Sequence, residues 1–409
     1  MGEAWIIDAA RTPRGIGKIG KGSLADIHPQ HILSTVLRAL AQRNGLETGN
    51  IDDVIAGCGT QFGKQGYCIA RMAALDAGYN PTAPAFTLDR FCGSGLTAVN
   101  LAAMGVMSGV QHLVVAGGVE SMSHAGTLPI RSTLDSGNLQ LRQRIPQPHQ
   151  GICADLIATL EGFHREDIDG LALESQRRAD AAIRAGYFSK SVVPVHRPDG
   201  SIALDHEEFP RPRTTLEGLA QLKSAFAELY VRPLDEEGTT YANLVRQAYP
   251  NVKINHIHTA GTSSGVVDGA GAVVIASPDY ARAHGLKPRA RIRAVTASGD
   301  NPTLMLNAPV PAAKRALAQA GMSLRDIDLF EINEAFAVVP LKFMRDLDID
   351  SSIVNVNGGA IALGHPIGAT GAIILGMLLD ELERRDLNVG LVTLCAAGGM
   401  APATIIERM

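Results

Sequence analysis

The chain is poor in aromatic residues and cysteine and carries no strong excess of charge. Aromatic side chains make up 4% of its 409 residues, with a single tryptophan, and the formal net charge is −4. That balance argues against a general surface for nucleic acid or membranes, although a local basic pocket for an anionic ligand stays open. The five cysteines are widely spaced, so they indicate neither a disulfide framework nor a zinc knuckle, and we expect a reducing compartment and no metal. They are Cys58, Cys68, Cys92, Cys153 and Cys395.

Long hydrophobic runs are also lacking. No apolar stretch reaches the roughly 18 residues of a membrane span. The first residues, Trp5–Asp8 among them, alternate like a strand and do not resemble a signal peptide, and the ending Glu407-Arg408-Met409 is not a peroxisomal signal of the S-K-L type. We expect a cytoplasmic protein without a membrane span.

Aliphatic residues and glycine are abundant, which favours an α/β fold. Hydrophobic residues make up 46% of the chain, and it contains 43 glycines. Such a composition is typical of buried strands joined by tight turns to helices, and the length predicts two domains or two fused halves. Two stretches of the first half recur in the second, each predicting a helix and then a strand. The similar segments are 39–45 with 316–321, 51–55 with 327–331, 95–99 with 371–375 and 113–118 with 391–395.

Between the halves lies a segment of different character, from about 119 to 250, in which prolines separate short helices. It predicts an inserted loop domain. Within it, residues 169–185 have helical periodicity and a charged face, and Gly186 is the expected stop. We interpret the charged face as solvated.

Cys92 is the first candidate for chemistry. It stands in Asp89-Arg90-Phe91-Cys92-Gly93-Ser94-Gly95, directly before an amphipathic stretch, so the thiol is expected at a helix N-terminus. Unpaired N–H groups and the helix dipole favour thiolate there, by about 0.3–1 kcal/mol. The small neighbours would leave the sulfur approachable. A buried, inert cysteine is the alternative that the local sequence leaves open.

The second half offers three further candidates. His365 lies in a rigid Gly-His-Pro loop, where it is either a base or a histidine bonded to backbone. Asn333 follows a predicted strand and either holds a water or oxyanion or caps a helix. Cys395 follows another strand, at the sheet edge where α/β proteins place ligands, although taken alone it predicts a packing residue.

Other patterns are weaker. Gly15-x-Gly17-x-x-Gly20 matches a dinucleotide fingerprint, but we reject it because the next helix is expected only near Leu24. His256 and His258 alternate on a predicted strand and lack a third ligand at metal spacing, which favours a structural role over zinc. Basic residues that fit an anionic ligand are Arg142, Arg144, Arg211, Arg213 and Lys223.

Taken together, these stretches resemble the thiolase family along nearly the whole chain. The resemblance rests on long motifs in the family's order. They are Arg11-Thr12-Pro13, Phe91-Cys92-Gly93-Ser94-Gly95, Gly117-Gly118-Val119-Glu120-Ser121-Met122-Ser123, Thr214-Thr215-Leu216-Glu217, Asn333-Glu334-Ala335-Phe336-Ala337, Asn355-Val356-Asn357-Gly358-Gly359-Ala360-Ile361-Ala362, Gly364-His365-Pro366-Ile367-Gly368 and Cys395.

The resemblance implies a five-layered α-β-α-β-α fold made of two duplicated halves and an inserted loop domain that binds coenzyme A. We place the N-terminal half at 1–118 and 251–275, the loop domain at 119–250 and the C-terminal half at 276–409. It also implies an acyltransferase that cleaves 3-oxoacyl-CoA thiolytically, or runs the reverse Claisen condensation. Its partners would be acyl-CoA substrates and other copies of the chain, as a homodimer or homotetramer, with no permanently bound cofactor.

Residue roles follow from the same resemblance. Cys92 would carry the acyl group, His365 would activate it, and Cys395 would move the α-proton. Asn333 would hold a water at one oxyanion site, and the N–H groups of Cys92 and Ala397 would form the other. Contacts to coenzyme A are implied for Arg211, Leu222, Ser264 and Phe336.

Some positions depart from the family pattern and put the substrate's size in question. They are Gln150 in His149-Gln150-Gly151, Thr262, and the pair Ala401-Pro402. Two rival hypotheses remain: a β-ketoacyl synthase, which usually pairs its cysteine with two histidines or with histidine and asparagine, and a thiolase-like acyl-CoA-binding subunit without turnover. The presence of Cys395 and of the complete candidate set argues against both.

Overall fold

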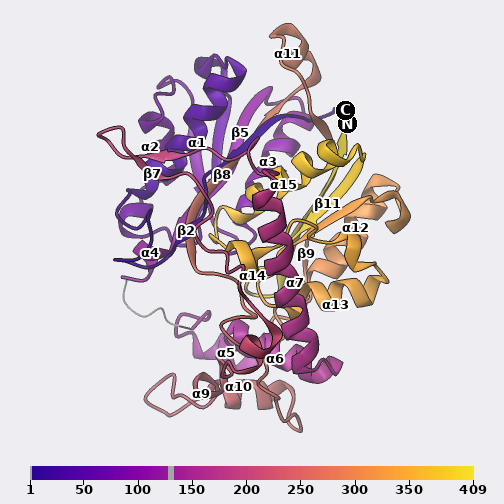
Figure 1. Ribbon diagram of the computed structural model, residues 1–409. Coiled ribbons are helices and arrows are strands. Elements are labelled where there is room, and N and C mark those ends of the chain that lie inside the picture. The colour runs from indigo at the N-terminus through magenta and orange to yellow at the C-terminus, as the bar shows by residue number, and fades with distance from the viewer. Residues whose placement is uncertain (1, 128–132) are drawn as a thin grey trace.

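A computed structural model describes residues 2–127 and 133–409, and a large mixed β-sheet runs through its centre (Figure 1). The order of its strands is β10-β11-β12-β9-β1-β8-β5-β3-β4, with β2 beside β8. The strands of this sheet are β1 (Trp5–Arg11), β2 (Gly15–Ile16), β3 (Asp53–Gly57), β4 (Ala85–Leu88), β5 (Leu113–Ser121), β8 (Val267–Ala276), β9 (Ala290–Gly299), β10 (Leu329–Ile332), β11 (Val389–Thr393) and β12 (Met400–Arg408).

The sheet consists of two halves with matching topology. They meet where Trp5 and Ile6 of β1 pair with Arg291 and Ala290 of β9. In the first half β3 and β5 are parallel, and β8 and then β1 follow antiparallel. In the second half β10 and β11 are parallel, and β12 and then β9 follow antiparallel. This correspondence agrees with the repeat in the sequence.

Helices form three layers around the two half-sheets. Helices α1 (Pro29–Asn44) and α2 (Ile69–Asp76) share a hydrophobic cluster with the first half-sheet, and α12 (Pro309–Ala320) and α13 (Val338–Leu347) share one with the second. Helices α3 (Ser94–Met107) and α15 (Thr370–Arg385) pack between the half-sheets. The predicted five-layered α-β-α-β-α fold is therefore confirmed.

The segment between the halves is divided: most of its short helices form a lobe below the sheet, whereas residues 165–184 lie beside the sheet and residues 195–204 pack with the first half (Figure 1). Its longest helix begins at Arg165, four residues before the predicted start, because His164 and Asp167 form a capping box there. Gly186, with φ +70°, follows its end as expected. The elements of this segment are α4 (Met122–Ala125), α5 (Leu139–Arg144), α6 (Gln150–Glu161), α7 (Arg165–Arg184), β6 (Val195–His196), β7 (Ile202–Leu204), α8 (Leu216–Ala220), α9 (Ala227–Tyr230) and α10 (Tyr241–Ala248).

The central helices cross closely because glycines line the crossing. A Cβ on Gly371 would lie 2.2 Å from the backbone nitrogen of Leu96, and one on Gly95 would lie 2.7 Å from the carbonyl oxygen of Gly368. Contacts this short admit only glycine. The crossing thus brings the N-terminus of α3, which follows Cys92, against the N-terminus of α15, which follows His365.

The first helix of the chain begins later than the sequence predicts. After β2 the chain forms turns, and α1 begins at Pro29, five residues beyond the predicted start, with His28 as its cap. The glycine-rich stretch around Gly17 therefore does not lead from a strand directly into a helix, which agrees with the rejection of a dinucleotide fingerprint. In the described ranges no helix combines the length and the apolar character that crossing a membrane requires.

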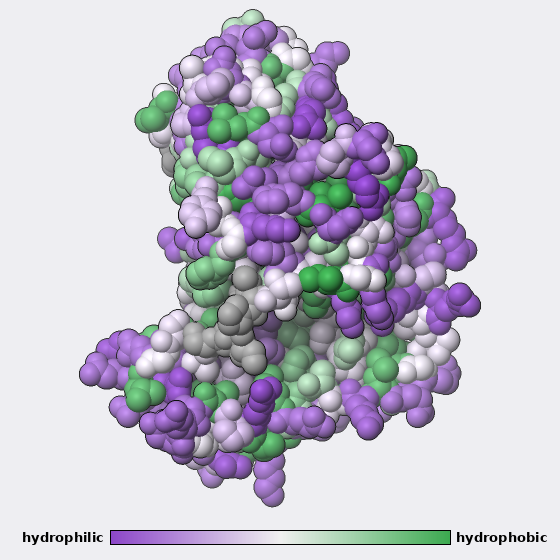
Figure 2. Space-filling model, turned by 90° about the vertical axis from the view of Figure 1, so that its left-hand side faces the viewer, coloured by the Kyte–Doolittle hydropathy of each residue, from purple (hydrophilic) through white to green (hydrophobic). Residues whose placement is uncertain are grey.

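The remaining elements are α11 (Pro278–Ala283) and α14 (Ala360–Leu363). On the face that Figure 2 shows, hydrophilic side chains predominate and hydrophobic ones occur in small groups.

Candidate active site

Cys92 lies in a tight turn between β4 and α3. Phe91 takes the left-handed conformation at φ +50°, and its N–H donates to Asp89 Oδ1 at 2.6 Å. Ser94 Oγ accepts from the Arg90 N–H at 2.8 Å and donates to the Phe91 carbonyl oxygen at 2.6 Å. These local bonds hold the nucleophile candidate against the first turn of the helix, as the sequence predicted.

The ionisation of Cys92 differs from the expectation. The side chain is buried, with 7% of the residue exposed. Burial raises the pKa of the Cys92 thiol to about 12, and the carboxylates of Glu120 and then Asp89 act in the same direction. The prediction of a stabilised, approachable thiolate is therefore wrong: desolvation and nearby negative charge outweigh the modest effect of a helix N-terminus.

His365 presents an unprotonated ring nitrogen. Its Nδ1 lies 2.6 Å from Thr370 Oγ1, and that hydroxyl donates to the carbonyl oxygen of Pro366 at 3.1 Å. When the hydroxyl donates to Pro366, Nδ1 carries the imidazole proton and Nε2 the lone pair. Within the described residues Nε2 is buried and has no partner. Burial lowers the pKa of His365 to about 4, so the ring is a neutral base near pH 7.

Asn333 and Cys395 lie at one edge of the second half-sheet. They follow the parallel neighbours β10 and β11, and the Asn333 N–H donates to the Thr393 carbonyl oxygen at 3.2 Å. Both polar atoms of the Asn333 side chain are buried without a partner among the described residues. Such a group is costly unless it binds something, about 1–3 kcal/mol, which favours a water or ligand over the helix cap.

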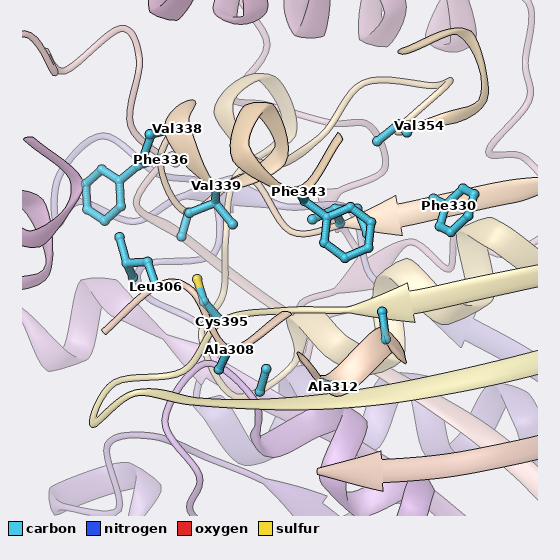
Figure 3. Close-up of a cluster of buried hydrophobic side chains, with 14 of the residues drawn as sticks. Leu306, Ala308, Ala312, Phe330, Phe336, Val338, Val339, Phe343, Val354 and Cys395 are labelled. Atoms are coloured by element: carbon cyan, nitrogen blue, oxygen red, sulfur yellow. The ribbon is translucent and has the colours of Figure 1, made fainter. Parts of the chain in front are cut away.

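Cys395 is almost fully buried and belongs to the hydrophobic cluster of Figure 3, where its sulfur is drawn near Leu306 and Val339. Burial raises the pKa of the Cys395 thiol, and the charge of an ionised Cys92 raises it further. The two cysteines are 303 positions apart in the sequence.

The turn after Cys395 completes this edge. Ala396 and Met400 exchange backbone hydrogen bonds, and Gly398 and Gly399 take positive φ angles of 77° and 76°. Ala397, the predicted oxyanion donor, is therefore in a tight loop. A Cβ on Gly93 would lie 2.9 Å from Cδ of Pro402, so this loop and the Cys92 turn are in contact.

A pocket opens on the side of the inserted segment, with a volume of about 190 Å³. Arg211 and Leu222 line it, as the predicted coenzyme A contacts should, together with Arg213. Ser264 and Phe336 are not among its lining residues. The Ser264 N–H donates to the Ala335 carbonyl oxygen at 3.0 Å, and Phe336 is 5% exposed and bridged to Ser263.

One basic candidate has a different role. Arg142 is buried and bonded to Asp135 at 2.9 Å and to Asp235 at 2.7 Å, so its charge is used within the lobe. Arg213 lines the pocket beside Arg211, whereas Lys223 and Arg144 are not among the lining residues.

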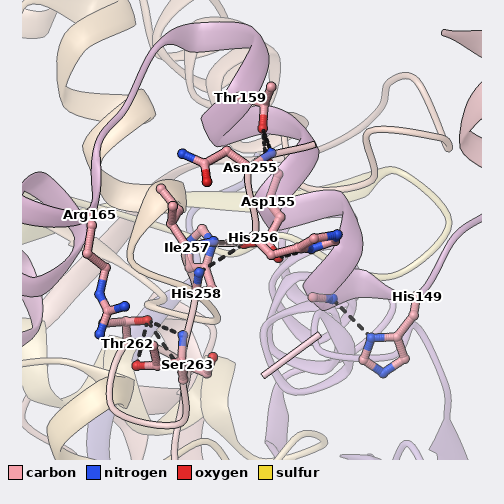
Figure 4. Close-up of polar contacts among 12 residues, drawn as sticks. His149, Asp155, Thr159, Arg165, Asn255, His256, Ile257, His258, Thr262 and Ser263 are labelled. Carbon is pink, nitrogen blue, oxygen red and sulfur yellow. Dashed lines mark hydrogen bonds and ion pairs between the residues drawn. The ribbon is translucent and has the colours of Figure 1, made fainter. Parts of the chain in front are cut away.

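His256 and His258 are not on a strand as predicted; their segment is extended without ladder pairing. Instead, Nδ1 of each ring lies 2.8 Å from a carboxylate oxygen of the buried Asp155 on α6 (Figure 4). This shared carboxylate supports the structural interpretation. In the described ranges no group of three or more His, Cys, Asp or Glu residues is arranged to hold a metal ion.

Sequence reasoning gave no role to Thr370 and Glu120. Thr370 Oγ1 bonds to Nδ1 of His365. Glu120 was part of a quoted motif, and its signal was a carboxylate in the otherwise small and apolar run Leu113–Val119. It is fully buried and accepts N–H bonds from Gly59 and Gly368.

Two family models match the chain, one in its N-terminal part and one in its C-terminal part. The model of the thiolase N-terminal domain matches residues 4–243, and that of the thiolase C-terminal domain matches residues 286–408.

Relatives of similar length agree. A 3-ketoacyl-CoA thiolase of Serratia proteamaculans is 39% identical over 99% of both chains. A steroid 3-ketoacyl-CoA thiolase of Mycobacterium tuberculosis is 39% identical over 100% of this chain and 95% of its own. The crystal structure of the Bacillus anthracis acetyl-CoA acetyltransferase superposes with a TM-score of 0.84 at 35% identity, covering 100% of this chain and 99% of the other.

Proposed function

The chain belongs to the thiolase family, and on that basis we propose that it is an acyl-CoA C-acyltransferase that cleaves 3-oxoacyl-CoA with coenzyme A, or condenses two acyl-CoA molecules in the reverse direction. One observation supports this most directly. Among the described residues, His365 Nε2 and both polar atoms of the Asn333 side chain are buried without a partner, which suits a base and a group that binds a water or an oxyanion.

In the first step Cys92 would attack the 3-oxo carbon. Its Sγ proton moves to Nε2 of His365 while the carbon–sulfur bond forms, because a free thiolate beside a protonated His365 is disfavoured by both pKa shifts. The N–H groups of Cys92 and Ala397 would face the oxygen that gains charge, and preorganised donors of this kind stabilise it.

In the second step the bond between C2 and C3 breaks, leaving the shortened acyl group on Cys92 and the electron pair on C2 of acetyl-CoA. Cys395 would donate its Sγ proton to that carbon, and its raised pKa makes the neutral, proton-carrying form the resting one. A water on Asn333 would stabilise the enolate oxygen. Free coenzyme A would then give its thiol proton to the Cys395 thiolate and take the acyl group from Cys92, whose departing sulfur regains the proton held on His365.

Coenzyme A would enter as a substrate, with no resident cofactor required. Arg211 is exposed, and its guanidinium lies 5.3 Å from the Phe209 ring centre at the mouth of the pocket, which suits a phosphate contact. Leu222, Ala260 and Gly261 line the same pocket. Ser264 and Phe336 would act nearer to the thioester.

The domain limits stay as we propose them from the sequence: 1–118 with 251–275, 119–250, and 276–409. In the structure β5 continues to Ser121 before the chain leaves the sheet.

We further propose a cytoplasmic homo-oligomer. Strand β4 is an edge of the sheet, and Phe86 on it is 39% exposed. Tyr67 is 90% exposed, and its neighbour Cys68 contacts the carbonyl oxygen of Ala85 on β4. An apolar edge strand of this kind is usually covered by a partner.

The test is thiolysis by the purified protein, with a panel running from acetoacetyl-CoA through long-chain to bulky cyclic 3-oxoacyl-CoA. We expect Cys92→Ala to abolish turnover while the protein folds normally. Cys395→Ala should still form acyl-Cys92 from an acyl-CoA but lose carbon–carbon cleavage. Cys153→Ala, another buried cysteine, is the matched control. Undiminished turnover in Cys92→Ala would exclude the assignment.

A further inference from the structure

Glu120 is a buried carboxylate that neither step above uses. It lies on β5, is fully buried, and interrupts a strand of small and apolar side chains. Burying a carboxylate is expensive unless several donors surround it. Its hydrogen-bond donors come from both halves of the chain, so this carboxylate connects the two halves.

One oxygen of Glu120 joins the halves. Oε2 accepts the Gly59 N–H at 2.8 Å and the Gly368 N–H at 2.9 Å. Oε1 accepts from Nε2 of Gln65 at 3.2 Å, and Gln65 is itself fixed because its Oε1 accepts the Ser121 N–H at 2.6 Å. The carboxylate is thus held in one orientation.

Gly368 lies in the turn that carries His365. The turn begins at His365 and ends at Thr370, whose side chains bond to each other, and Glu120 grips its middle. The backbones are in close contact here, since a Cβ on Gly118 would lie 2.0 Å from the Gly368 carbonyl oxygen. A shift of the turn would therefore move the imidazole relative to Cys92.

We propose that Glu120 is a positioning residue for the thiolase reaction: it locks the turn that carries His365 to the half that carries Cys92. The inference rests on the proposed function for its catalytic part. A second effect accompanies this link: an ionised Glu120 raises the pKa of the Cys92 thiol, whereas burial raises the pKa of Glu120 itself.

The charges that face Cys92 support the second effect. They are the carboxylates of Glu120 and Asp89, and the larger of the two contributions to the raised pKa of Cys92 comes from Glu120. Cys395 is the other titratable group coupled to it, and His365 is neutral. Asp89 is exposed, so solvent screens its charge more than that of Glu120.

Two substitutions separate the two effects. Glu120→Gln removes the charge, but its amide oxygen can still accept both glycine N–H groups, while Gln65 keeps its bond to the Thr60 carbonyl oxygen. Glu120→Asp keeps the charge, but the side chain is one methylene shorter and cannot reach both amides. Asp89→Asn neutralises the exposed carboxylate and is the matched control for charge.

Two measurements are made on the full-length protein: kcat for acetoacetyl-CoA thiolysis, and the rate of Cys92 alkylation by iodoacetamide between pH 6 and 10. For Glu120→Gln we expect alkylation at pH 8 to rise at least about tenfold, one unit in the Cys92 pKa, with kcat lowered no more than about fivefold. For Glu120→Asp we expect kcat to fall at least about thirtyfold, because a shift of the His365 imidazole by about 1 Å is enough for a loss of this size. The pH dependence of Cys92 alkylation should stay unchanged, because the carboxylate charge is kept. Asp89→Asn should change alkylation by less than Glu120→Gln.

A folded Glu120→Asp protein with wild-type kcat would overturn the positioning role. An unchanged alkylation profile in Glu120→Gln would overturn the charge effect. If the wild-type protein alkylates at Cys92 but shows no thiolysis with the whole substrate panel, the proposed function fails, and the alkylation profiles still decide whether the Glu120 charge acts on Cys92.

Discussion

Thr370 controls which nitrogen of His365 is the base, and Thr370→Val tests this. Valine keeps the shape of threonine but removes the hydroxyl that lies 2.6 Å from His365 Nδ1. The Nδ1–H then either stays buried without an acceptor, or the proton moves to Nε2, which can then no longer accept the proton of Cys92. Both outcomes raise the barrier to proton transfer from the thiol.

The size of the effect follows from the burial of His365. Leaving a buried donor unpaired costs about 1–3 kcal/mol, which is roughly a 5- to 150-fold change in rate. We expect kcat for thiolysis to fall by about 10- to 100-fold, with KM for coenzyme A changed by less than about twofold, because the hydroxyl is remote from the pocket around Arg211.

The assay is steady-state thiolysis of acetoacetyl-CoA, with burst-phase acylation of Cys92 measured separately. Thr296→Val is the control, because it also removes a buried hydroxyl bonded to a backbone carbonyl oxygen, that of Ala312, but on β9 away from the site. Wild-type acylation in Thr370→Val would refute the tautomer argument, and equal losses in both variants would indicate a general loss of stability.

Three further predictions follow from the same contacts. Asp155→Ala should lower the free energy of unfolding by about 3–5 kcal/mol, measured by urea denaturation, because His256 and His258 lose their shared buried acceptor. His365→Asn should make the free energy of unfolding depend less on pH between about 4 and 6.5. In the wild-type protein the unfolded chain protonates this histidine near pH 6.5, whereas the folded chain does so only near pH 4. Wild-type stability therefore falls by on the order of 3 kcal/mol as the pH is lowered through this window. Arg211→Met should raise KM for coenzyme A roughly three- to tenfold at nearly constant kcat, with a weaker dependence on salt.

Each has a control. Asp205→Ala breaks an exposed Asp–His pair with His206 and should cost far less than Asp155→Ala; equal losses would contradict the burial argument. If the stability of His365→Asn still falls with pH as in the wild-type protein, the loss between about pH 6.5 and pH 4 comes from other titratable groups. Arg142→Met should lower stability and leave KM for coenzyme A unaffected, and a selective rise in KM there would move the phosphate site away from Arg211.

Much of the fold could be predicted because it depends on local patterns and on duplication. Helix ends at Gly45 and Gly321 are left-handed, as the sequence indicated. Starts were less accurate, at Pro29 and Arg165, because caps such as His28 and His164 are not typical capping residues. The strand predicted for His256 and His258 failed because a carboxylate from α6 satisfies that backbone instead.

The candidate site divides in the same way. The sequence by itself determined that the chain has two similar halves, and it predicted which residues carry the chemistry, since Cys92, His365, Asn333 and Cys395 stand in long motifs. It did not determine their proton states. A helix N-terminus favoured a Cys92 thiolate, whereas only the folded chain surrounds that thiol with apolar groups and the charge of Glu120. Desolvation and charge act through space, so the tertiary structure decided that Cys92 is a thiol and that His365 is neutral. It also decided that Glu120 joins Gly59 to Gly368.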